Sequence, residues 1–447
     1  GMFAFTGYSS SEFDIGNLGQ WDVSNVTTFN CMFNVAGRNS TTWNVGDLSE
    51  WNIGKAVRLD NMFYYAGYAD TTWNIGDISN WNTSNATNIS QMFYYAGYNS
   101  TVWNVGNLGT KKIDNGDGTF RTAWDVSNVE DMSFMFAYSG YKSTTLYLGN
   151  LSSWNTGNVT NMESMFDSFG YSASTLTLDN LSGWDTCKVT TMYKMFRYFA
   201  YKLNEVSLDL TSWNTSNVTN MSYMFYYAGY TATSWDIGNL NGWVTSNVTN
   251  FSYMFSYAGY NSSMFDIGSL NSWNVSAAET MTSMFAYAGY LSPSFNLDLS
   301  NWTTSVLINV TSMFKYSGYS ATSWSVGNLS GWNISNVTSL FEMFNYAGYS
   351  ASTFDIGNIG NWNVEKITDL SYMFNYAGYS STVWNIGELN NWNISNVTTT
   401  AYMFSYAGYN AVSWNIGDLS EWNTSSVTNM SSFFYCAGYD SGSFDLG

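Results

Sequence analysis

A single phrase of about 30 residues is repeated along the chain, and it constrains the fold more than any other feature. Each copy is anchored by a Met-Phe pair, which most copies follow with Tyr-Ala-Gly-Tyr, as in residues 92–98. Fifteen anchors run from Met2 to Phe433, most of them 30 residues apart. A fixed period of this length is typical of stacked repeats, in which neighbouring copies bury each other's apolar faces. We therefore expect residues 1–447 to form a single elongated repeat domain.

Residues 71–100 indicate how one copy folds. Residues 72–76, Thr-Trp-Asn-Ile-Gly, alternate polar and apolar types, which predicts a short strand with one buried face. Ile89, Met92 and Phe93 recur at i, i+3 and i+4, which predicts a short helix that a glycine ends. Stacked copies then predict a repeat solenoid of about fifteen repeats. Its parallel β-sheet lies on one face, with short helical turns opposite.

The charge balance excludes several classes of partner. The chain has 13 Lys and Arg against 32 Asp and Glu, which gives a net charge of −19. Such a field repels nucleic acid and anionic membranes, and no apolar run reaches the length of about 18 residues that a spanning helix needs. The chain begins and ends within a repeat, without the polar caps of natural solenoids. We expect a segment of a longer protein, with any export signal and anchor outside it.

The residue types also argue against catalysis. Histidine, the most common general acid or base, is absent from the sequence. No Ser-His-Asp or Cys-His set can therefore form, and no phosphate-binding loop is present. The carboxylates recur with the repeat and do not stand out as an isolated pair. We expect a protein that is not an enzyme and that needs no cofactor.

Residues 213–225, Trp-Asn-Thr-Ser-Asn-Val-Thr-Asn-Met-Ser-Tyr-Met-Phe, and the Leu-Asp-Leu strands at 208–210 and 297–299 carry a family resemblance. The pattern resembles the BspA-like leucine-rich-repeat surface proteins, in the sub-type also found in mycoplasma-type lipoproteins. A common form of that family has a shorter repeat without the Tyr-Ala-Gly-Tyr segment. The resemblance covers essentially the whole chain and implies a leucine-rich-repeat-like fold. It also implies an extracellular or cell-surface location in a bacterium and a role in adhesion or host interaction.

Two aromatic positions recur in each copy. The tryptophan of the second half is repeated without variation from Trp21 to Trp422. This constancy favours a core ladder, with each indole N–H bonded to backbone, over a sugar-binding stripe. The tyrosines near the glycine stop, such as Tyr226, Tyr227 and Tyr230, are candidates for a recognition surface. We expect one tyrosine per copy to pack and another to face solvent.

The polar column on the outward face of the sheet admits two interpretations. It is either a solvated face or a ladder whose neighbouring carboxylates share a cation. Asp236 and Asp266, one strand apart, are weak candidates for such a metal site, although no calcium-loop spacing accompanies them.

Two irregular stretches break the array. Thirteen extra residues fall within 109–121, where a glycine-rich turn predicts a β-hairpin with a local basic spot. Residues 142–210 lose the strand tryptophans and gather Lys and Arg. Insertions in repeat proteins lie in loops and often mark a binding face, although many are only tolerated. The candidate binding residues are Lys111, Lys112, Asp114, Asp117, Arg121, Tyr147, Lys194, Arg197, Lys202 and Tyr227.

The leading hypothesis is a non-enzymatic bacterial cell-surface or secreted protein that acts in adhesion or in protein or glycan binding. Its partner would be a protein or glycan of a host or neighbouring cell. One alternative is a purely structural spacer or filament-forming module, in which unpaired terminal strands allow end-to-end self-association. Another is a carbohydrate-binding rod that uses exposed Tyr or Trp.

Overall fold

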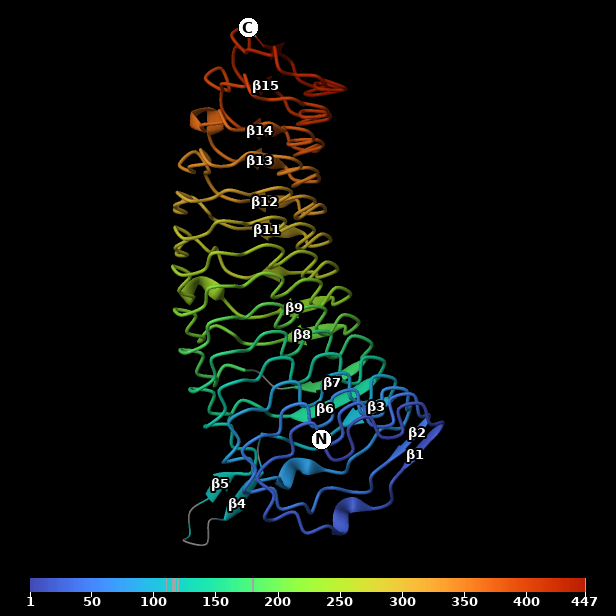
Figure 1. The fold of residues 1–447 in the computed structure, drawn as a ribbon. Coiled ribbons are helices and arrows are strands. Elements are labelled where there is room, and N and C mark those ends of the chain that lie inside the picture. The colour runs from blue at the N-terminus through green and yellow to red at the C-terminus, as the bar shows by residue number, and fades with distance from the viewer. Residues whose placement is uncertain (110, 115–117, 119, 179–180, 447) are drawn as a thin grey trace. The chain divides into compact units, whose positions relative to one another are not determined.

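The computed structural model describes residues 1–109, 111–114, 118, 120–178 and 181–446. Its residues divide into two compact units, Gly1–Asn217 and Val218–Gly447. Each unit is a parallel β-solenoid in which the chain advances one turn about every 30 residues (Figure 1). The described residues form about 12 turns with almost no helix, so the repeat count is slightly lower than the sequence suggests.

The first unit stacks its strands in parallel. β1 pairs with β2, and β3 pairs with β6, which also pairs with β7, always between successive copies. β4 and β5 belong to the insertion and pair antiparallel outside the coil (Figure 1). The elements are β1 (Glu12–Asp14), η1 (Leu18–Gln20), β2 (Thr42–Asn44), η2 (Ile78–Asn80), β3 (Val102–Asn104), β4 (Lys112–Asp114), β5 (Phe120–Thr122), β6 (Thr145–Gly149), β7 (Thr175–Leu178) and β8 (Glu205–Ser207).

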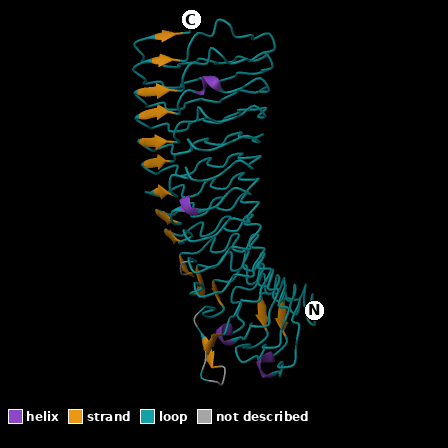
Figure 2. Ribbon diagram, turned by 90° about the vertical axis from the view of Figure 1, so that its left-hand side faces the viewer, coloured by secondary structure: helices purple, strands orange, loops and turns teal. Residues whose placement is uncertain are grey.

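The second unit repeats the same plan without an insertion. β9 pairs with β10, β11 with β12, β13 with β14 and β15 with β16, all parallel. Within each unit the strands lie along one side of the coil (Figure 2). The elements are β9 (Ser234–Asp236), η3 (Leu240–Gly242), β10 (Phe265–Asp266), β11 (Ser294–Asn296), β12 (Ser323–Ser325), β13 (Thr353–Asp355), η4 (Ile359–Asn361), β14 (Val383–Asn385), β15 (Trp414–Asn415) and β16 (Phe444–Asp445).

The Met-Phe segment forms consecutive backbone turns and not the short helix that its periodicity predicts. Gln91 and Tyr95 have φ angles of 55° and 58°, whereas every residue of a right-handed helix needs a negative φ. The N–H groups of Gln91, Phe93 and Tyr95 donate to carbonyl oxygens of the next copy, at 2.8–3.0 Å. The alternate N–H groups of Met92 and Tyr94 donate three residues back. Half of the backbone donors therefore join neighbouring copies, whereas a helix would satisfy them within one copy.

The invariant tryptophans form the predicted core ladder. Trp81 and Trp124 stack with ring centroids 6.4 Å apart, and Trp302 and Trp332 stack at 5.9 Å. Nearly all of these indole N–H groups donate to a backbone carbonyl of a preceding copy, as Trp81 does to Leu48 at 2.9 Å. These rings are buried, except that Trp21 is exposed and Trp422 is half-buried. The prediction of a core ladder is confirmed, and a surface stripe of tryptophans is not present in the described residues.

Asn and Asp side chains stabilise the tight turns within each copy. Asn74 Oδ1 accepts the N–H of Gly76, and Asp77 Oδ1 accepts the N–H of Ser79, each two residues ahead. This Asx-turn geometry lets a polar side chain replace a backbone partner. Gly106 shows why glycine follows the strand: its φ is 90°, and a Cβ there would overlap Asp77 Oδ1. The polar residues of the repeat are therefore part of its scaffold.

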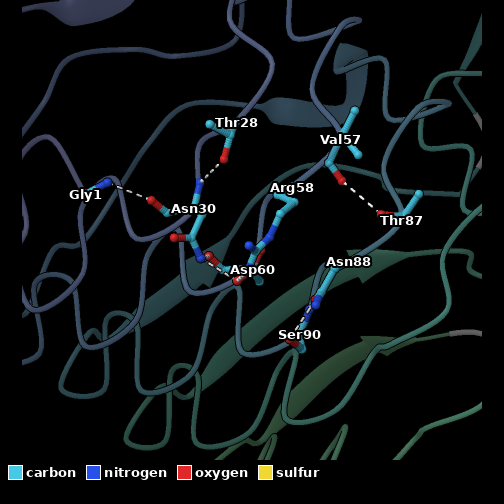
Figure 3. A network of polar contacts seen from close by, with 9 residues as sticks. All are labelled: Gly1, Thr28, Asn30, Val57, Arg58, Asp60, Thr87, Asn88 and Ser90. Atoms are coloured by element: carbon cyan, nitrogen blue, oxygen red, sulfur yellow. Dashed lines mark hydrogen bonds and ion pairs between the residues drawn. The ribbon is translucent and has the colours of Figure 1, made fainter.

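Polar side chains make contacts both within and between neighbouring copies of the first unit (Figure 3). Asp60 is buried and accepts hydrogen bonds from the Asn30 amide and from the Arg58 guanidinium, whose nitrogens lie 2.7 and 2.9 Å away. Asn88 Oδ1 accepts from the backbone N–H and hydroxyl of Ser90. The contacts from Asn30 and Arg58 therefore satisfy the buried carboxylate within the scaffold.

Candidate functional site

Two tyrosine columns cover the turn side of the solenoid, and together they are called the tyrosine face. The inner column holds the first tyrosine of each Tyr-Ala-Gly-Tyr segment, and the outer column holds the last. In the second unit the outer column is unbroken and the inner column runs without a gap to Tyr406, after which Cys436 takes the tyrosine position. The centroid separations are 4.1–4.6 Å in the inner column and 4.5–4.8 Å in the outer. The residues are Tyr227, Tyr257, Tyr287, Tyr316, Tyr346, Tyr376 and Tyr406, and Tyr230, Tyr260, Tyr290, Tyr319, Tyr349, Tyr379, Tyr409 and Tyr439.

The backbone turns position the inner column. Tyr287 has a φ of 59°, a left-handed conformation that costs an L-residue about 1–2 kcal/mol. Its ring stacks on Tyr257 and Tyr316 at 4.3 and 4.6 Å, and an aromatic pair contributes about 0.5–1.5 kcal/mol beyond burial. Its N–H also donates to Lys315 of the next copy at 2.7 Å. The strained conformation is therefore offset by contacts that only a stacked neighbour provides.

Most of these rings are half-buried, so the expected division into one packed and one solvent-facing tyrosine is not observed. Burial, followed by the neighbouring Tyr257 and Tyr316, raises the pKa of Tyr287 above its usual value. In the first unit burial, followed by Tyr68, raises the pKa of Tyr98 to about 12. The face therefore stays neutral at physiological pH and offers ring surface together with phenolic hydroxyl groups.

Cations lie against the tyrosines of the first unit. Arg38 replaces a tyrosine of the outer column, and its guanidinium lies 5.1 Å from the ring centres of Tyr65 and Tyr68. Lys194 lies 4.4 Å from the Tyr193 ring, and Lys202 lies 6.0 Å from the Tyr171 ring, within the range of cation–π attraction. All Lys and Arg except Lys315 and Lys366 belong to this unit.

Arg197 is held by a buried acid. Its Nη2 lies 2.7 Å from Asp167 Oδ2 and donates to the Tyr138 hydroxyl at 2.7 Å. Burial raises the pKa of the Asp167 carboxyl, and the hydrogen bond from Arg197 lowers it only in part. The guanidinium is thus engaged by the solenoid's own groups, which makes it a structural residue and a poor ligand donor.

A groove of about 630 Å³ lies on the strand side of the first unit and is called the first groove. Asn104 of β3 and Tyr147 of β6 face each other in register along it. Tyr147 stands in the outward column that other copies fill with Asn, Asp, Ser or Thr. The remaining lining residues are Thr72, Trp73, Asn74, Gly76, Asp77, Thr101, Val102, Gly106 and Asn107.

The second unit has a corresponding groove of about 790 Å³, called the second groove. It too is lined by Thr, Val, Asn and an acid, here Glu388, but it has no residue equivalent to Tyr147. Asn385 Nδ2 donates to Asp355 Oδ1 of the preceding copy at 2.9 Å, so the amide is used within the sheet. The two grooves share their backbone and differ in chemistry.

The structure distributes the sequence-predicted site residues over separate places. Lys111 and Lys112 are exposed within the insertion, Asp114 ends β4, and Arg121 of β5 is opposite Ile113 of β4. Arg197 and Lys202 lie against the tyrosine face of the first unit, whereas Lys194 lies against Tyr193, which is outside both columns. Tyr147 lines the first groove, and Tyr227 belongs to the inner column of the second unit. Asp117 lies outside the described residues.

The carboxylates of the weak metal candidates serve the backbone. Asp236 and Asp266 are in register between β9 and β10, and each accepts the N–H of the glycine two residues ahead, at 2.8 and 2.9 Å. Among the described residues, no three Cys, Asp or Glu side chains come together as metal ligands. The pair remains a prediction from sequence.

Sequence reasoning singled out Tyr147 but missed the groove around it. Asn74, Asp77, Asn104 and Asn107 belong to the repeat and look like scaffold when each is considered alone. The sequence signal for this groove was that tyrosine replaces the usual polar residue of the outward column in one copy, while the neighbouring copies keep a polar residue.

In the described residues, no helix is long and apolar enough to cross a membrane. No curated protein and no solved structure matches the chain. One family matches repeatedly, at residues 2–123, 108–234, 139–263, 229–350 and 346–443, and its description is "Mycoplasma protein of unknown function". These matches cover nearly the whole chain with tandem copies of the family's repeat, in agreement with the solenoid. The chain therefore belongs to the DUF285 family.

Proposed function

We propose that this chain is a non-enzymatic repeat protein that acts in adhesion at a bacterial cell surface, by binding a protein or a glycan of another surface. The observation that carries the proposal is the tyrosine face, because rigid half-exposed tyrosines repeat along both units. Tyrosine supplies large contact area at a low cost in side-chain entropy.

The stack also preorganises this surface. The rings inside the second unit's columns are each held between two neighbours less than 5 Å away, so little freedom is lost when a partner binds. A long face of this kind suits many weak contacts, whose avidity grows with the number engaged. The resemblance to the BspA-like leucine-rich-repeat surface proteins supports a surface location and an adhesive role. The absence of histidine from the sequence supports a binding role over catalysis.

Beads coated with the full chain test the proposal directly. We expect them to adhere to cultured host-type cells, and pretreatment of the cells with protease or glycosidase identifies the partner as a protein or a glycan. A triple variant of the outer column, with Tyr319, Tyr349 and Tyr379 each changed to Ser, should lose most of this adhesion. The matched control changes the exposed Thr338, Thr368 and Thr398 to Ser.

Circular dichroism must first show that both variants are folded. A folded wild-type chain that adheres to no cell type contradicts the proposal, and so does adhesion that the tyrosine variant retains. If the inert chain assembles as its concentration rises, light scattering would support the alternative of a structural spacer or filament module.

A further inference from the structure

We propose that the first groove binds a neutral oligosaccharide, with Tyr147 as the platform on which one sugar ring stacks. This inference rests on the proposed function. For the case in which the partner is a glycan, it specifies the class of glycan and the place on the chain where it binds.

The position of Tyr147 is the first argument. It is the only aromatic residue in an outward column that otherwise reads Asp, Asn, Ser or Thr. Strand pairing places it directly beside Asn104 on one side and Thr177 on the other. Its ring is half-buried at the groove, with Val102 of β3, 50% exposed, also lining it. An apolar ring next to amide groups matches a pyranose, which has apolar C–H faces and polar edges.

The open hydrogen-bonding capacity of the groove is the second argument. Asn74 and Asn104 each use Oδ1 to accept the N–H of a following glycine, at 2.8 and 2.9 Å. Asn107 Oδ1 accepts the N–H of Gly109 at 3.1 Å. In the described residues none of these three amide nitrogens donates a hydrogen bond to the protein. The repeat therefore fixes each side chain through its oxygen and leaves the Nδ2 group available to a ligand.

Asp77 provides the matching acceptor. Its Oδ1 is occupied by the Ser79 N–H, while among the described contacts its Oδ2 accepts no hydrogen bond. A sugar hydroxyl donates and accepts at the same time, so adjacent amide donors and a carboxylate acceptor can bind a vicinal pair of hydroxyls. Side chains held by backbone contacts are the preorganised polar groups that give small-ligand sites their specificity.

Charge and size select the class of sugar. Of the residues that line the groove none is Lys or Arg, and Asp77 contributes a negative charge. Such a lining disfavours sulfated or sialylated glycans by like-charge repulsion and favours a neutral chain. The volume of about 630 Å³ lies within the range of about 300–1,000 Å³ found for small-molecule sites and exceeds what one sugar ring fills.

The experiment uses the full chain on an array of neutral hexose and N-acetylhexosamine oligosaccharides, with sialylated and sulfated glycans on the same array. Binders are then titrated by calorimetry against three variants. Tyr147→Thr installs the residue type of the in-register Thr177 and should weaken binding by at least about tenfold, as expected for a central aromatic contact.

Asn104→Asp is the sharper variant. Asp355 makes the same turn to Gly357 at 2.9 Å, so the substitution preserves the backbone contact. It replaces the amide donor by a carboxylate oxygen and adds one negative charge, which the control variant adds as well. It should weaken binding several-fold at unchanged melting temperature. The matched control, Asn415→Asp, makes the identical change in the second groove and should leave binding unchanged.

The inference is overturned if the folded chain binds no neutral glycan on the array, or if it binds only anionic glycans. Affinity that Tyr147→Thr leaves unchanged also overturns it. If beads still adhere to cells in any of these cases, only this inference fails and the proposed function remains. If adhesion is absent as well, both fail.

Discussion

The two units use one scaffold in different ways. The second unit repeats its plan with little change: the outer tyrosine column is unbroken, the inner column is interrupted only at Cys436, and Lys315 and Lys366 are its only basic residues. The first unit carries the insertion, the cations against the tyrosine rings, the buried pair of Asp167 and Arg197, and the groove with Tyr147. The comparison indicates that the regular copies secure the fold, while the departures from the repeat supply distinct chemistry.

The backbone explains why such departures are tolerated. The turn segments join copies through main-chain hydrogen bonds in both units, as from Phe93 to Met135 at 2.9 Å and from Phe344 to Met373 at 2.9 Å. These bonds do not depend on side-chain type, so an outward position can change without disturbing the stack. Inward positions have no such freedom, because each buried ring packs on the copies before and after it.

Alkaline pH should have the largest effect. Burial and neighbouring tyrosines raise the pKa values of Tyr287 and Tyr346, so these two side chains stay protonated in the folded state above pH 10, where unfolded tyrosines ionise. Their contribution to stability is complete below about pH 10 and is lost as the pH rises through the folded pKa. We expect the melting temperature to fall steeply above pH 10, followed by circular dichroism and tyrosinate absorbance.

Tyr-to-Phe variants test whether the units differ in this respect. Tyr287→Phe with Tyr346→Phe should shift the alkaline midpoint upward, because burial and then neighbouring tyrosines raise these pKa values strongly. Tyr64→Phe with Tyr65→Phe should shift it less, because Arg38 offsets part of the effect of burial there. Equal shifts would show that Arg38 does not distinguish the first unit.

Loss of one tryptophan of the core ladder should lower the stability of both units equally. Trp154 and Trp302 are buried to the same degree, and each indole donates to a backbone carbonyl at 2.9 Å. Changing either to Ala should lower the free energy of unfolding by about 3–5 kcal/mol, measured by urea denaturation. A difference between the two variants larger than about 1 kcal/mol would contradict the view that the scaffold is shared.

Removing one partner of an ion pair in each unit should lower the free energy of unfolding by unequal amounts. The Asp167 side chain is 3% exposed and that of Arg197 is 22%, against 16% and 24% for Glu342 and Lys315. Arg197→Met leaves a buried carboxylate without its partner and should cost about 3 kcal/mol, whereas Lys315→Met should cost about 1 kcal/mol or less.

The control is the pH dependence of the loss in unfolding free energy that Arg197→Met causes. The pKa of Asp167 is already raised by burial, so a carboxyl without Arg197 binds a proton more readily in the folded state. Stability from a raised carboxyl pKa is present below the unfolded value of about 4 and lost as pH rises. The deficit should therefore be smaller at pH 4 than at pH 7, and a deficit independent of pH would refute this explanation.

The smallest expected effect is a difference in stability between Gly and Ala substitutions, whose sign differs between the inner and the outer tyrosine column. Tyr287 has a positive φ, so Tyr287→Gly should be more stable than Tyr287→Ala by about 1 kcal/mol. Tyr290 of the outer column has no such conformation, and the order should reverse there, with Ala better by about 0.5–1 kcal/mol. Thermal denaturation of the four variants gives both differences, and the same order at the two positions would exclude strain in the inner column.

Sequence reasoning predicted the strands and the tryptophan ladder because these positions depend on periodicity and burial alone. Trp73 and Ile75 alternate with polar residues, and a buried indole that recurs in each copy has few options besides stacking. The helix at Ile89, Met92 and Phe93 was wrong because i, i+3, i+4 spacing is shared by a run of backbone turns. The positive φ angles of Gln91 and Tyr95 and the hydrogen bonds to the next copy distinguish the two.

By itself, the sequence determined the period, the parallel stack, the residues that face inward and the acidic character of the chain. These follow from spacing and composition, which act locally and repeat with each copy. The tertiary structure alone decided that the Asn and Asp oxygens support the turns, and that Asn74, Asn104 and Tyr147, up to 73 positions apart, line one groove. That arrangement depends on which copies become neighbours and which atoms the backbone occupies, because a hydrogen-bonding group is open to a ligand only where the fold has not used it.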